Sequence, residues 1–454
     1  MRIVWMSCCL FLCTSFYIWA QTEKPPNIIF LLTDDQRWDA LGYAGNEIIQ
    51  TPEMDLLAKE GVYFENAFVT TPICAASRAS IISGQYERQH DYTFQKPPIS
   101  VEQIQRSYFH LIKEAGFYTG FLGKLGLRLE QRLDTALFDV YQPEYTNFYW
   151  RFDAKSDGHI HLTDLMGRRA VDFINNVPAD RPFVLNLSYN APHAEDRSPD
   201  QYIWPRAVDT LYQDIQIPLP PNAEDAHFEE QPDFVKTGFN RVRWYWRYDT
   251  QDKYQHSVKG YYRMITAIDR TIGQIRVALE EKGLADNTII ILLGDNGYFL
   301  GERQFAGKWL MYDNALRVPL IIYDPRRAQH HDINELALNI DIAPTMLDFL
   351  NIPIPESMQG KSLLPFLKGA APTNWRQQFL CEHLWDFEHI PASEGIRNQE
   401  WKYFRYVDHP DHEELYHLAS DPLELQNLAG LPAYLEIQKT LKQDLERLIS
   451  ESKQ

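Results

Sequence analysis

Residues 27–32 have the sequence NIIFLL, and Thr33, Asp34 and Asp35 follow them directly. This segment indicates the fold class. A continuous apolar run of this length that ends in polar residues is typical of a strand buried on both faces of a parallel sheet. Three later runs repeat the pattern: 183–187 (FVLNL), 288–293 (TIIILL) and 318–323 (VPLIIY). Amphipathic helical segments lie between the runs, for example 51–60, 164–175 and 260–282. Strands that alternate with helices predict an α/β fold with a largely parallel central sheet flanked by helices.

The length of the chain and a change of pattern near its carboxyl end predict two domains. The chain has 454 residues, which exceeds the size of about 250–300 residues at which a single core usually stops growing. After Pro372 the long apolar runs give way to short alternating segments, and a helical segment covers 433–450. We therefore expect a large domain of residues 21–371 and a smaller α+β domain of residues 372–454 with a small antiparallel sheet and a terminal helix.

The first residues predict export. Met1 and Arg2 supply a positive start, residues 3–18 are mostly apolar, and Ala20 is a small residue suited to cleavage. This pattern is typical of a signal peptide, here residues 1–20, and predicts a periplasmic or secreted protein. The apolar run is shorter than the roughly 20 residues of a spanning helix, so we expect no transmembrane segment in the mature chain. A lipoprotein anchor at Cys13 is disfavoured by the bulky Leu12 before it.

The composition is that of an ordinary globular protein, and its charge excludes some partners. The chain carries 62 acidic and 44 basic residues, a formal net charge of −18. Such a surface repels nucleic acid and anionic membranes. Outside the predicted signal peptide only Cys74 and Cys381 remain, too few for a disulfide framework. The two can pair with each other, or Cys381 is a small buried residue and Cys74 has a chemical role.

Polar residues at the ends of two distant strands suggest a metal site. Asp34 and Asp35 follow the first run, and Asp295 and Asn296 follow the third. Ligands of parallel sheets bind at the carboxyl ends of the strands, so these side chains are expected to meet. Ligation by oxygen alone favours calcium or magnesium over zinc. An isolated Asp-Asp pair is more often a turn or capping pair, and the wider pattern is needed to favour the metal.

That wider pattern resembles a known family. Residues 74–78 (CAASR) resemble the C-x-P/A-x-R signature of type I sulfatases, members of the alkaline phosphatase superfamily. Residues 190–193 (NAPH) resemble the family's A-P-H element, and 294–297 (GDNG) resemble its D-N/H-G metal element. Gly307 and Lys308 resemble its lysine segment. The resemblance runs from about residue 27 to residue 428, and it implies an alkaline-phosphatase-like fold.

The resemblance also implies a cofactor set and a reaction. A maturation enzyme would oxidise Cys74 to formylglycine (3-oxoalanine). One divalent metal ion, with calcium expected, would be held by Asp34, Asp35, Asp295, Asn296 and the oxygen of residue 74. A hydrated aldehyde supplies one hydroxyl to attack sulfur and a second to expel sulfate, which a serine cannot do. The substrate class implied is a sulfated carbohydrate, such as ulvan, carrageenan or glycosaminoglycan fragments.

The remaining roles implied concern cationic residues. Arg78, one helical turn after Cys74, would anchor the formylglycine hydrate. Lys124, His193 and Lys308 would neutralise the sulfate oxygens, and Lys308 or His193 would protonate the leaving oxygen.

Three features depart from the family pattern or allow two interpretations. The family's G-K-W-H-L-G segment is shortened to GKLG at 123–126, so a histidine is missing, which His90 or a water is a candidate to replace. Arg303 stands where relatives often have histidine, and we expect it at the pocket rim. Residues 241–247 (RVRWYWR) mix arginine with aromatic residues; helix packing is favoured, with sugar stacking second.

Two alternative functions stay open. A phosphatase or phosphodiesterase of the same superfamily would use serine or threonine and two zinc ions, for which the sequence shows no ligand set. A carbohydrate-binding homologue with impaired catalysis would be consistent with the missing histidine.

Conversion of Cys74 is directly testable. Peptide mass spectrometry of active protein should show residue 74 as the aldehyde, with the mass loss of thiol-to-aldehyde conversion. Full activity in a preparation whose residue 74 is entirely cysteine would contradict the assignment. Because Cys74→Ser keeps the shape of the side chain, it should lose turnover and keep substrate binding, unless the maturation enzyme also converts serine.

Overall fold

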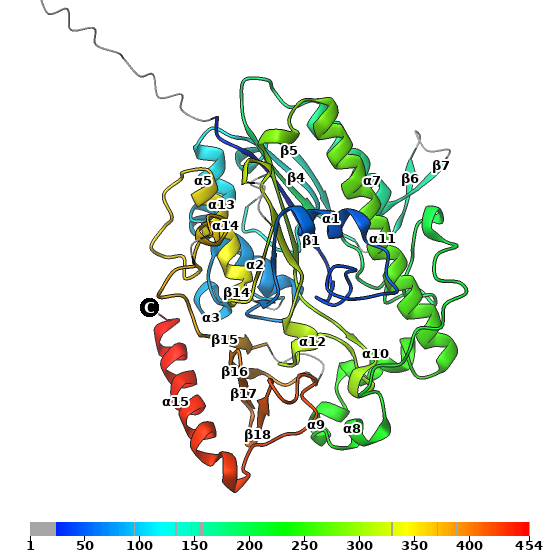
Figure 1. Ribbon diagram of the computed structural model, residues 1–454, viewed down its shortest axis with the longest axis vertical. Coiled ribbons are helices and arrows are strands. Elements are labelled where there is room, and N and C mark those ends of the chain that lie inside the picture. The colour runs from blue at the N-terminus through cyan, green and yellow to red at the C-terminus, as the bar shows by residue number, and fades with distance from the viewer. Residues whose placement is uncertain are drawn as a thin grey trace, which may run out of the picture.

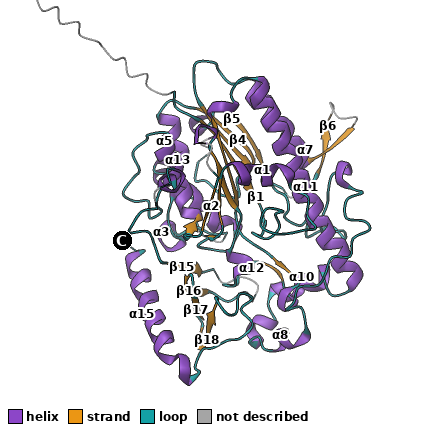
Figure 2. Ribbon diagram, in the orientation of Figure 1, coloured by secondary structure: helices purple, strands orange, loops and turns teal. Residues whose placement is uncertain are grey.

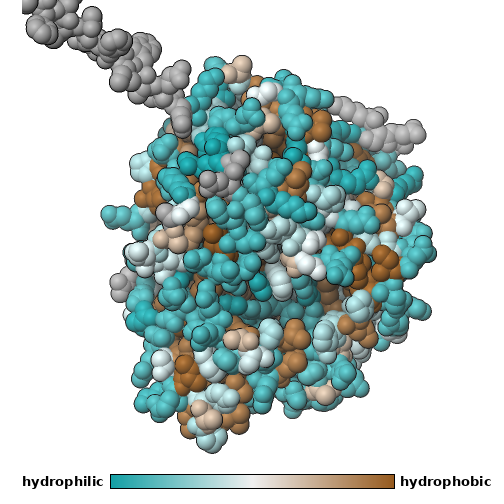
Figure 3. Space-filling view, in the orientation of Figure 1, coloured by the Kyte–Doolittle hydropathy of each residue, from teal (hydrophilic) through white to brown (hydrophobic). Residues whose placement is uncertain are grey.

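The computed structural model describes residues 24–453 except 95, 132–133, 147, 154–157, 328–329, 370 and 386–388. The predicted signal peptide, residues 1–20, and Cys13 lie outside the described residues. Within the described part, no helix is long and apolar enough to cross a membrane. Figure 3 shows a largely hydrophilic face, with apolar groups scattered over it rather than gathered in one band.

An eight-stranded sheet forms the centre of the molecule, in the order β13-β2-β12-β9-β1-β8-β4-β5 (Figure 1). Its strands are β1 (Asn27–Thr33), β2 (Val62–Phe64), β4 (Tyr118–Lys124), β5 (Val140–Glu144), β8 (Phe183–Ser188), β9 (Thr288–Gly294), β12 (Leu320–Tyr323) and β13 (His331–Ile333). β1 pairs in parallel with β8 and β9, and β4 pairs in parallel with β8 and β5. The predicted α/β fold with a mainly parallel sheet is confirmed.

The direction of β12 corrects one prediction. The run at 318–323 was expected as another parallel strand, yet β12 pairs antiparallel with β9 and with β2. A parallel connection needs a crossover of a dozen or more residues, usually with a helix that returns the chain to the opposite edge. Between β9 and β12 lie short elements alone: the hairpin of β10 (Phe299–Leu300) and β11 (Ala306–Gly307), the 3-10 turn within it (Glu302–Gln304), and the single turn α12 (Asp313–Leu316). The chain therefore re-enters the sheet from the edge it left.

Helices cover both faces of the sheet (Figure 2). β1 is buried along its whole length because its side chains alternate between two cores. Ile29 and Leu31 pack in the core with α1 (Pro52–Glu60), α7 (Leu162–Asn175) and α11 (Gln251–Glu281). Ile28 and Phe30 pack in the core with α2 (Cys74–Ser83), α5 (Tyr108–Glu114) and α13 (Ile342–Phe349). The central strand is thus held from both sides.

Short elements complete the sheet's surroundings. Two further two-stranded pairs are β3 (Ala67–Phe68) with β14 (Ala337–Leu338), and β6 (Trp150–Asp153) with β7 (Gly158–His161). The short helices are α3 (Glu87–His90), α4 (Val101–Gln105), α6 (Asp134–Leu137), α8 (Asp225–Glu229), α9 (Asp233–Lys236), α10 (Phe239–Arg247) and α14 (Leu364–Leu367).

The carboxyl-terminal region is an antiparallel sheet backed by a helix. The strands β15 (Gln378–His383), β16 (Ser393–Asn398), β17 (Trp401–Tyr406) and β18 (His409–His417) pair in that order. One face carries Leu380 and Ile396 against α15 (Leu435–Glu451), and the other carries Phe379 and Phe404 into the core beneath the central sheet. Because this core is shared, the boundary at residue 372 stays a prediction.

A buried ionic cluster joins the two regions. Lys402 of β17 is fully buried and lies 2.5 Å from Asp313 of α12 and 2.6 Å from Glu424. Arg397 of β16 reaches Asp313 at 3.0 Å. Burial raises the pKa of Asp313, but Arg397 and Lys402 outweigh it and hold this pKa well below its ordinary value. Two cations of the small antiparallel sheet are therefore neutralised by a carboxylate of α12, which belongs to the region of the large sheet.

Removing Asp313 should destabilise the protein strongly, because the buried Arg397 would lose its carboxylate partner and the buried Lys402 would lose one of its two. We expect Asp313→Ala to lower the free energy of unfolding by about 3–5 kcal/mol, measured by urea denaturation. The control is Asp444→Ala in α15, whose carboxylate pairs with the half-exposed Arg447 at 3.0 Å, and whose loss should change the free energy by less than about 1 kcal/mol. Equal effects of the two substitutions would contradict this account of the cluster.

Candidate active site

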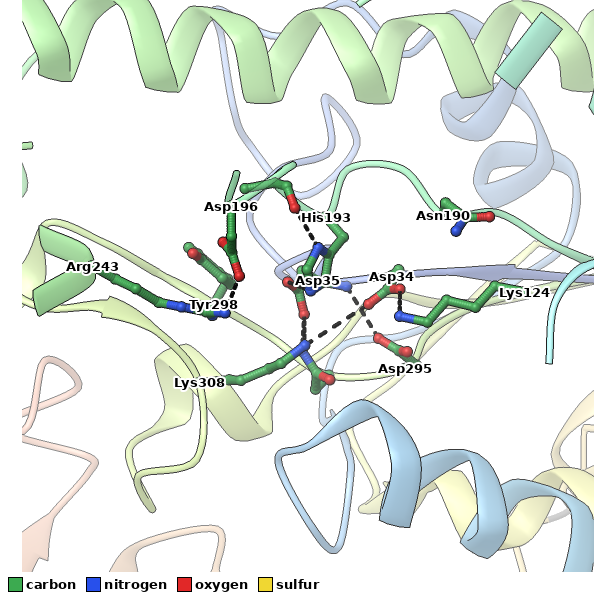
Figure 4. Close-up of polar contacts among 12 residues, drawn as sticks. Asp34, Asp35, Lys124, Asn190, His193, Asp196, Arg243, Asp295, Tyr298 and Lys308 are labelled. Carbon is green, nitrogen blue, oxygen red and sulfur yellow. Dashed lines mark hydrogen bonds and ion pairs between the residues drawn. The ribbon is translucent and has the colours of Figure 1, made fainter. Parts of the chain in front are cut away.

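Polar residues gather where the carboxyl ends of β1, β4, β8 and β9 meet the start of α2. The register aligns Thr33 with Gly294, and Leu32 with Ser188. The residues after each strand therefore emerge at one edge of the sheet. Figure 4 shows Asp34, Asp35, Lys124, His193, Asp295 and Lys308 pointing toward one another at this edge.

Cys74 is the first residue of α2 and follows Ile73 in extended backbone. It is buried and free, as is Cys381, so the two do not pair. The amide N–H groups of the first helical turn lack partners within the helix, so the start of α2 presents partial positive charge to residue 74. Cys381 is fully buried in β15, and burial raises the pKa of its thiol to about 12. It is the small buried residue that the sequence predicted.

The adjacent carboxylates Asp34 and Asp35 are both almost completely buried. The N–H of Asp34 donates to the carbonyl of Ala191 at 3.1 Å. Asp35 has a left-handed backbone with φ 68°, and its N–H donates to Oδ1 of Asp295 at 3.1 Å. This turn of the backbone aims the two neighbouring side chains at different partners.

Two lysines neutralise this pair. Lys124 Nζ contacts Asp34 Oδ2, and Lys308 Nζ contacts Asp35 Oδ1 and lies 3.9 Å from Asp34 Oδ1. Burial raises the pKa of Asp34, but the charge of Lys124, together with those of Lys308 and Arg78, outweighs it and holds this pKa well below its ordinary value. Burial lowers the pKa of Lys308, but Asp35 and its anionic neighbours raise it further, so the lysine stays charged.

Arg78 ties α2 to three strand ends. Its Nε donates to Asp295 Oδ2 at 2.8 Å, and its Nη1 donates to the Lys124 carbonyl and to Ser188 Oγ, both at 2.6 Å. Burial and the charge of Asp34 raise the pKa of Asp295 to about 6, against the opposing effect of Arg78. The sequence analysis does not predict Ser188 as a site residue, although it directly follows the predicted strand 183–187, and ligands of parallel sheets bind at the carboxyl ends of the strands.

Buried oxygen atoms at the site fit a metal ion. Within the described structure, Asp34 Oδ1, Asp35 Oδ2 and Asn296 Oδ1 are buried without a hydrogen-bond donor. Asp34, Asp35 and His193 each offer a ligand atom within 4.8 Å of the others. The Asn296 amide donates to Asp35 Oδ1 at 2.6 Å and to the Gly297 carbonyl at 2.9 Å, so its own oxygen is left for another partner. A hard divalent cation would satisfy all three oxygens.

All of the site residues predicted from the sequence lie in this part of the molecule: Asp34, Asp35, Cys74, Arg78, Lys124, His193, Asp295, Asn296 and Lys308. Two details differ from the expected roles. Both oxygens of Asp295 already accept hydrogen bonds, from Asp35 and Arg78. His193, expected to contact sulfate, also belongs to the group able to hold a metal.

Two residues considered from the sequence do not take the expected places. The ring nitrogens of His90 bond to Ser80 Oγ at 3.0 Å and to the N–H of Tyr92 at 3.1 Å, so they are already engaged away from the acid pair. Arg303 is buried, 2% exposed, and its Nη2 donates to the Leu423 and Glu424 carbonyls, so it borders a hollow at the carboxyl-terminal region and not the acid pair. A left-handed backbone at Arg303, φ 52°, directs it to the carboxyl-terminal region instead.

Two models of known protein families match this chain. A family model described as Sulfatase matches residues 26–352. A second model, described as N-sulphoglucosamine sulphohydrolase, C-terminal, matches residues 301–451.

Similar proteins carry sulfatase names. The N-acetylglucosamine-6-O-sulfatase of Bacteroides thetaiotaomicron is 29% identical over 94% of this chain and 86% of that protein. The arylsulfatase of Clostridium perfringens is 29% identical over 93% of this chain and 94% of that protein. The ulvan-active sulfatase of Formosa agariphila is 26% identical over 95% of this chain and 83% of that protein.

Solved structures share the fold. One, in complex with its substrate D-glucosamine-2-N,6-O-disulfate, superposes with a TM-score of 0.79 at 26% identity over 95% of this chain and 98% of that one. A phosphonate monoester hydrolase from Silicibacter pomeroyi also has a TM-score of 0.79, at 23% identity over 94% of this chain and 96% of that one. At that identity the second likeness concerns the fold alone.

Proposed function

Since the chain belongs to the sulfatase family, we propose that it hydrolyses sulfate esters of a sulfated carbohydrate, with a formylglycine made from Cys74 and one divalent metal ion. The observation that supports this most directly is the position of Cys74. It begins α2 and interacts electrostatically with Arg78, Lys124 and Lys308. A nucleophile surrounded by cations suits an anionic ester, and a net-acidic chain needs such a local positive centre to bind one.

Oxygen ligands favour calcium as the metal. Asp34, Asp35 and Asn296 each leave a buried oxygen without a donor, and Asp295 and residue 74 lie beside them. A bound cation would acidify the hydroxyl of the hydrated aldehyde and offset the charge of the sulfate. Calcium suits this oxygen-rich set better than zinc, which prefers nitrogen and sulfur. The described residues contain one group able to hold a metal, which argues against a two-zinc phosphatase.

The lysines and His193 have different proton roles. His193 Nδ1 lies 2.6 Å from the Ala194 carbonyl, so Nδ1 is the protonated nitrogen of the neutral ring and Nε2 bears a lone pair. Burial lowers the pKa of His193, which favours that neutral ring. Lys308, whose pKa is raised, carries a proton at neutral pH. We therefore assign protonation of the leaving oxygen to Lys308, and charge neutralisation to both Lys124 and Lys308.

The proposal extends to substrate and location. Relatives named for N-acetylglucosamine-6-O-sulfate and for ulvan support a sulfated sugar as substrate. Residues 1–20 would direct export to the periplasm or beyond, and a formylglycine-generating enzyme would have to act on Cys74. Lys124 lies in the ring of cations although the histidine of its segment is missing, which favours an active enzyme over a protein that only binds carbohydrate.

Sulfate release tests the function. Matured protein should release sulfate from at least one member of a panel containing 6-O-sulfated N-acetylglucosamine and sulfated ulvan, carrageenan and glycosaminoglycan oligosaccharides. A chelator should abolish the activity, and calcium should restore it better than zinc, because the free ligand atoms are mainly hard oxygens. A protein that contains two zinc ions and cleaves 4-nitrophenyl phosphate but no sulfate ester would favour the phosphatase alternative.

Lys124 and Lys308 should each contribute to the rate of sulfate release, beyond any effect on folding. A lost contact to a developing charge in a dry site costs roughly 2–4 kcal/mol. Lys124→Ala and Lys308→Ala should therefore each lower kcat/KM for sulfate release by about two to three orders of magnitude. The exposed Lys439 of α15 provides the control, and Lys439→Ala should change kcat/KM little. Variants that melt normally and keep near-wild-type kcat/KM would overturn this assignment of the sulfate pocket.

A further inference from the structure

The helix α10 (Phe239–Arg247) turns its arginines inward and some of its aromatic residues outward. Arg243 and Arg247 are 6% and 0% exposed, whereas Tyr245 and Trp246 are 49% and 39% exposed. Buried guanidinium groups are costly unless a specific anion pairs with them. Neither helix packing nor sugar stacking alone, the two interpretations of residues 241–247, explains why this helix buries its charge.

Both arginines converge on one carboxylate. Arg247 contacts Asp196 Oδ1. Arg243 contacts Asp196 Oδ2 (Figure 4). The side chain of Asp196 is 30% exposed, while those of Arg243 and Arg247 are 8% and 0% exposed. A molecule approaching from solvent therefore meets the carboxylate before it meets the guanidinium groups behind.

The carboxylate is rigid and keeps acceptor capacity. Arg247 is itself fixed by Gln201 Oε1 at 2.9 Å and by Tyr298 Oη at 2.5 Å. A carboxylate has about four lone-pair positions, and the arginines take one on each oxygen. Burial raises the pKa of Asp196, but Arg243, Arg247 and His193 lower it to about 2. The group is thus an ionised hydrogen-bond acceptor throughout the neutral range.

Asp196 lies beside the catalytic centre. It follows His193 by three residues, and Figure 4 shows it next to His193 on the side that faces Arg243. The guanidinium of Arg243 lies 4.9 Å from the ring of Trp309, the residue after Lys308. Asp196 is thus linked through Arg243 and Trp309 to Lys308, the lysine assigned to protonate the leaving oxygen.

A hollow of about 290 Å³ opens at this position, lined by Thr146, Phe148, Ala194, Glu195, Asp196 and Arg197. Small-molecule sites begin near roughly 300 Å³, so the hollow offers room for about one sugar ring. The exposed Phe148 provides an apolar surface in the same wall.

We propose that Asp196 is a specificity-determining residue that accepts a hydrogen bond from a free hydroxyl of the sugar whose sulfate is removed. The inference rests on the proposed function and narrows its substrate class. A hydroxyl is a donor that the carboxylate of Asp196 can bind, whereas an ionised sulfate or carboxylate at that position has no proton to donate to it. The enzyme therefore selects a sugar that is unsubstituted at the position facing Asp196.

Substitution of Asp196 tests the proposal through a ratio of substrates. The probes are 4-nitrophenyl sulfate, which has no hydroxyl, and the monosulfated sugar that the wild-type protein hydrolyses best, starting with 6-O-sulfated N-acetylglucosamine. Asp196→Asn should lower the ratio of kcat/KM for the sugar to kcat/KM for the aryl sulfate by about 10- to 100-fold, the effect of losing a charged hydrogen bond. An unchanged ratio would overturn the proposal.

A matched control separates this effect from the loss of any ionic pair. Glu53 pairs with Arg276 at 2.6 Å and its side chain is 31% exposed, close to the 30% of Asp196, but it lies on α1. Glu53→Gln should leave the ratio as in wild type. If the wild-type protein releases sulfate from neither probe, the proposed function fails, and that result is distinct from an unchanged ratio in an active enzyme.

Deoxy analogues of the sugar test the proposal with the wild-type protein, so the test does not depend on the folding of Asp196→Asn. With the wild-type protein, removing one particular ring hydroxyl should lower kcat/KM about 10- to 100-fold, and a second sulfate at that position should lower it at least as much. In Asp196→Asn the same deoxy analogue should cost less than about 3-fold further, because the partner is already altered. Tolerance of every single-hydroxyl deletion by the wild-type protein, or equal costs in both proteins, would contradict the assignment.

Discussion

Two neighbouring carboxylates, Asp34 and Asp35, are buried at the end of the central strand, and much of the site is arranged around their charge. Two anions removed from water in adjacent positions are unstable unless cations surround them. Each cation comes from a different element: Arg78 from α2, Lys124 from β4 and Lys308 from the segment after β11. The balance of charge therefore requires segments far apart in the sequence to meet at one edge of the sheet.

The central sheet and the two cores hold these carboxylates and cations in fixed positions. β1 is held by parallel neighbours on both sides and by two cores, so the position of its carboxyl end is fixed. Arg78 spans from α2 to Asp295, Ser188 and the Lys124 carbonyl, and this orients the first turn of α2. Cys74 is thereby placed at a helix start facing cations. A group that must be both reactive and shielded from water needs such rigid support.

The same requirement, that buried charges be paired with opposite charges, also applies at Asp196, outside the centre of the site. There two buried arginines hold one carboxylate, which is the most exposed group of the three and therefore presents an acceptor to solvent. The inner cations suit the charged sulfate, and the outer anion suits a neutral hydroxyl. A pocket that offers donors and cations at its centre and a carboxylate acceptor beside it can recognise a molecule with one charged group and several hydroxyls, such as a monosulfated sugar.

The fold class, and most of the residues that meet at the inner site, could be predicted from the sequence. The apolar run at 27–32 can only be buried on both faces, and parallel strands bring their polar ends to one edge, so Asp34, Asp35, Asp295 and Asn296 were predictable together. The signature at Cys74–Arg78 added the proposed nucleophile and its arginine through resemblance to a family. These features are local, or follow from a rule that holds for every parallel sheet.

The tertiary structure alone decided the features that depend on contacts between distant residues. The direction of β12 and the burial of Arg303 follow from how the chain returns after β9. β4 was missed because glycines interrupt its apolar run, yet a Cβ at Gly120 would lie 2.5 Å from the Phe173 ring, and one at Gly123 would lie 1.9 Å from the Ser188 carbonyl oxygen. The pairing of Asp196 with Arg243 and Arg247 joins residues 47 and 51 positions apart in the sequence. No periodicity marks such a pair, because its geometry exists only once α10 has packed against the loop after β8.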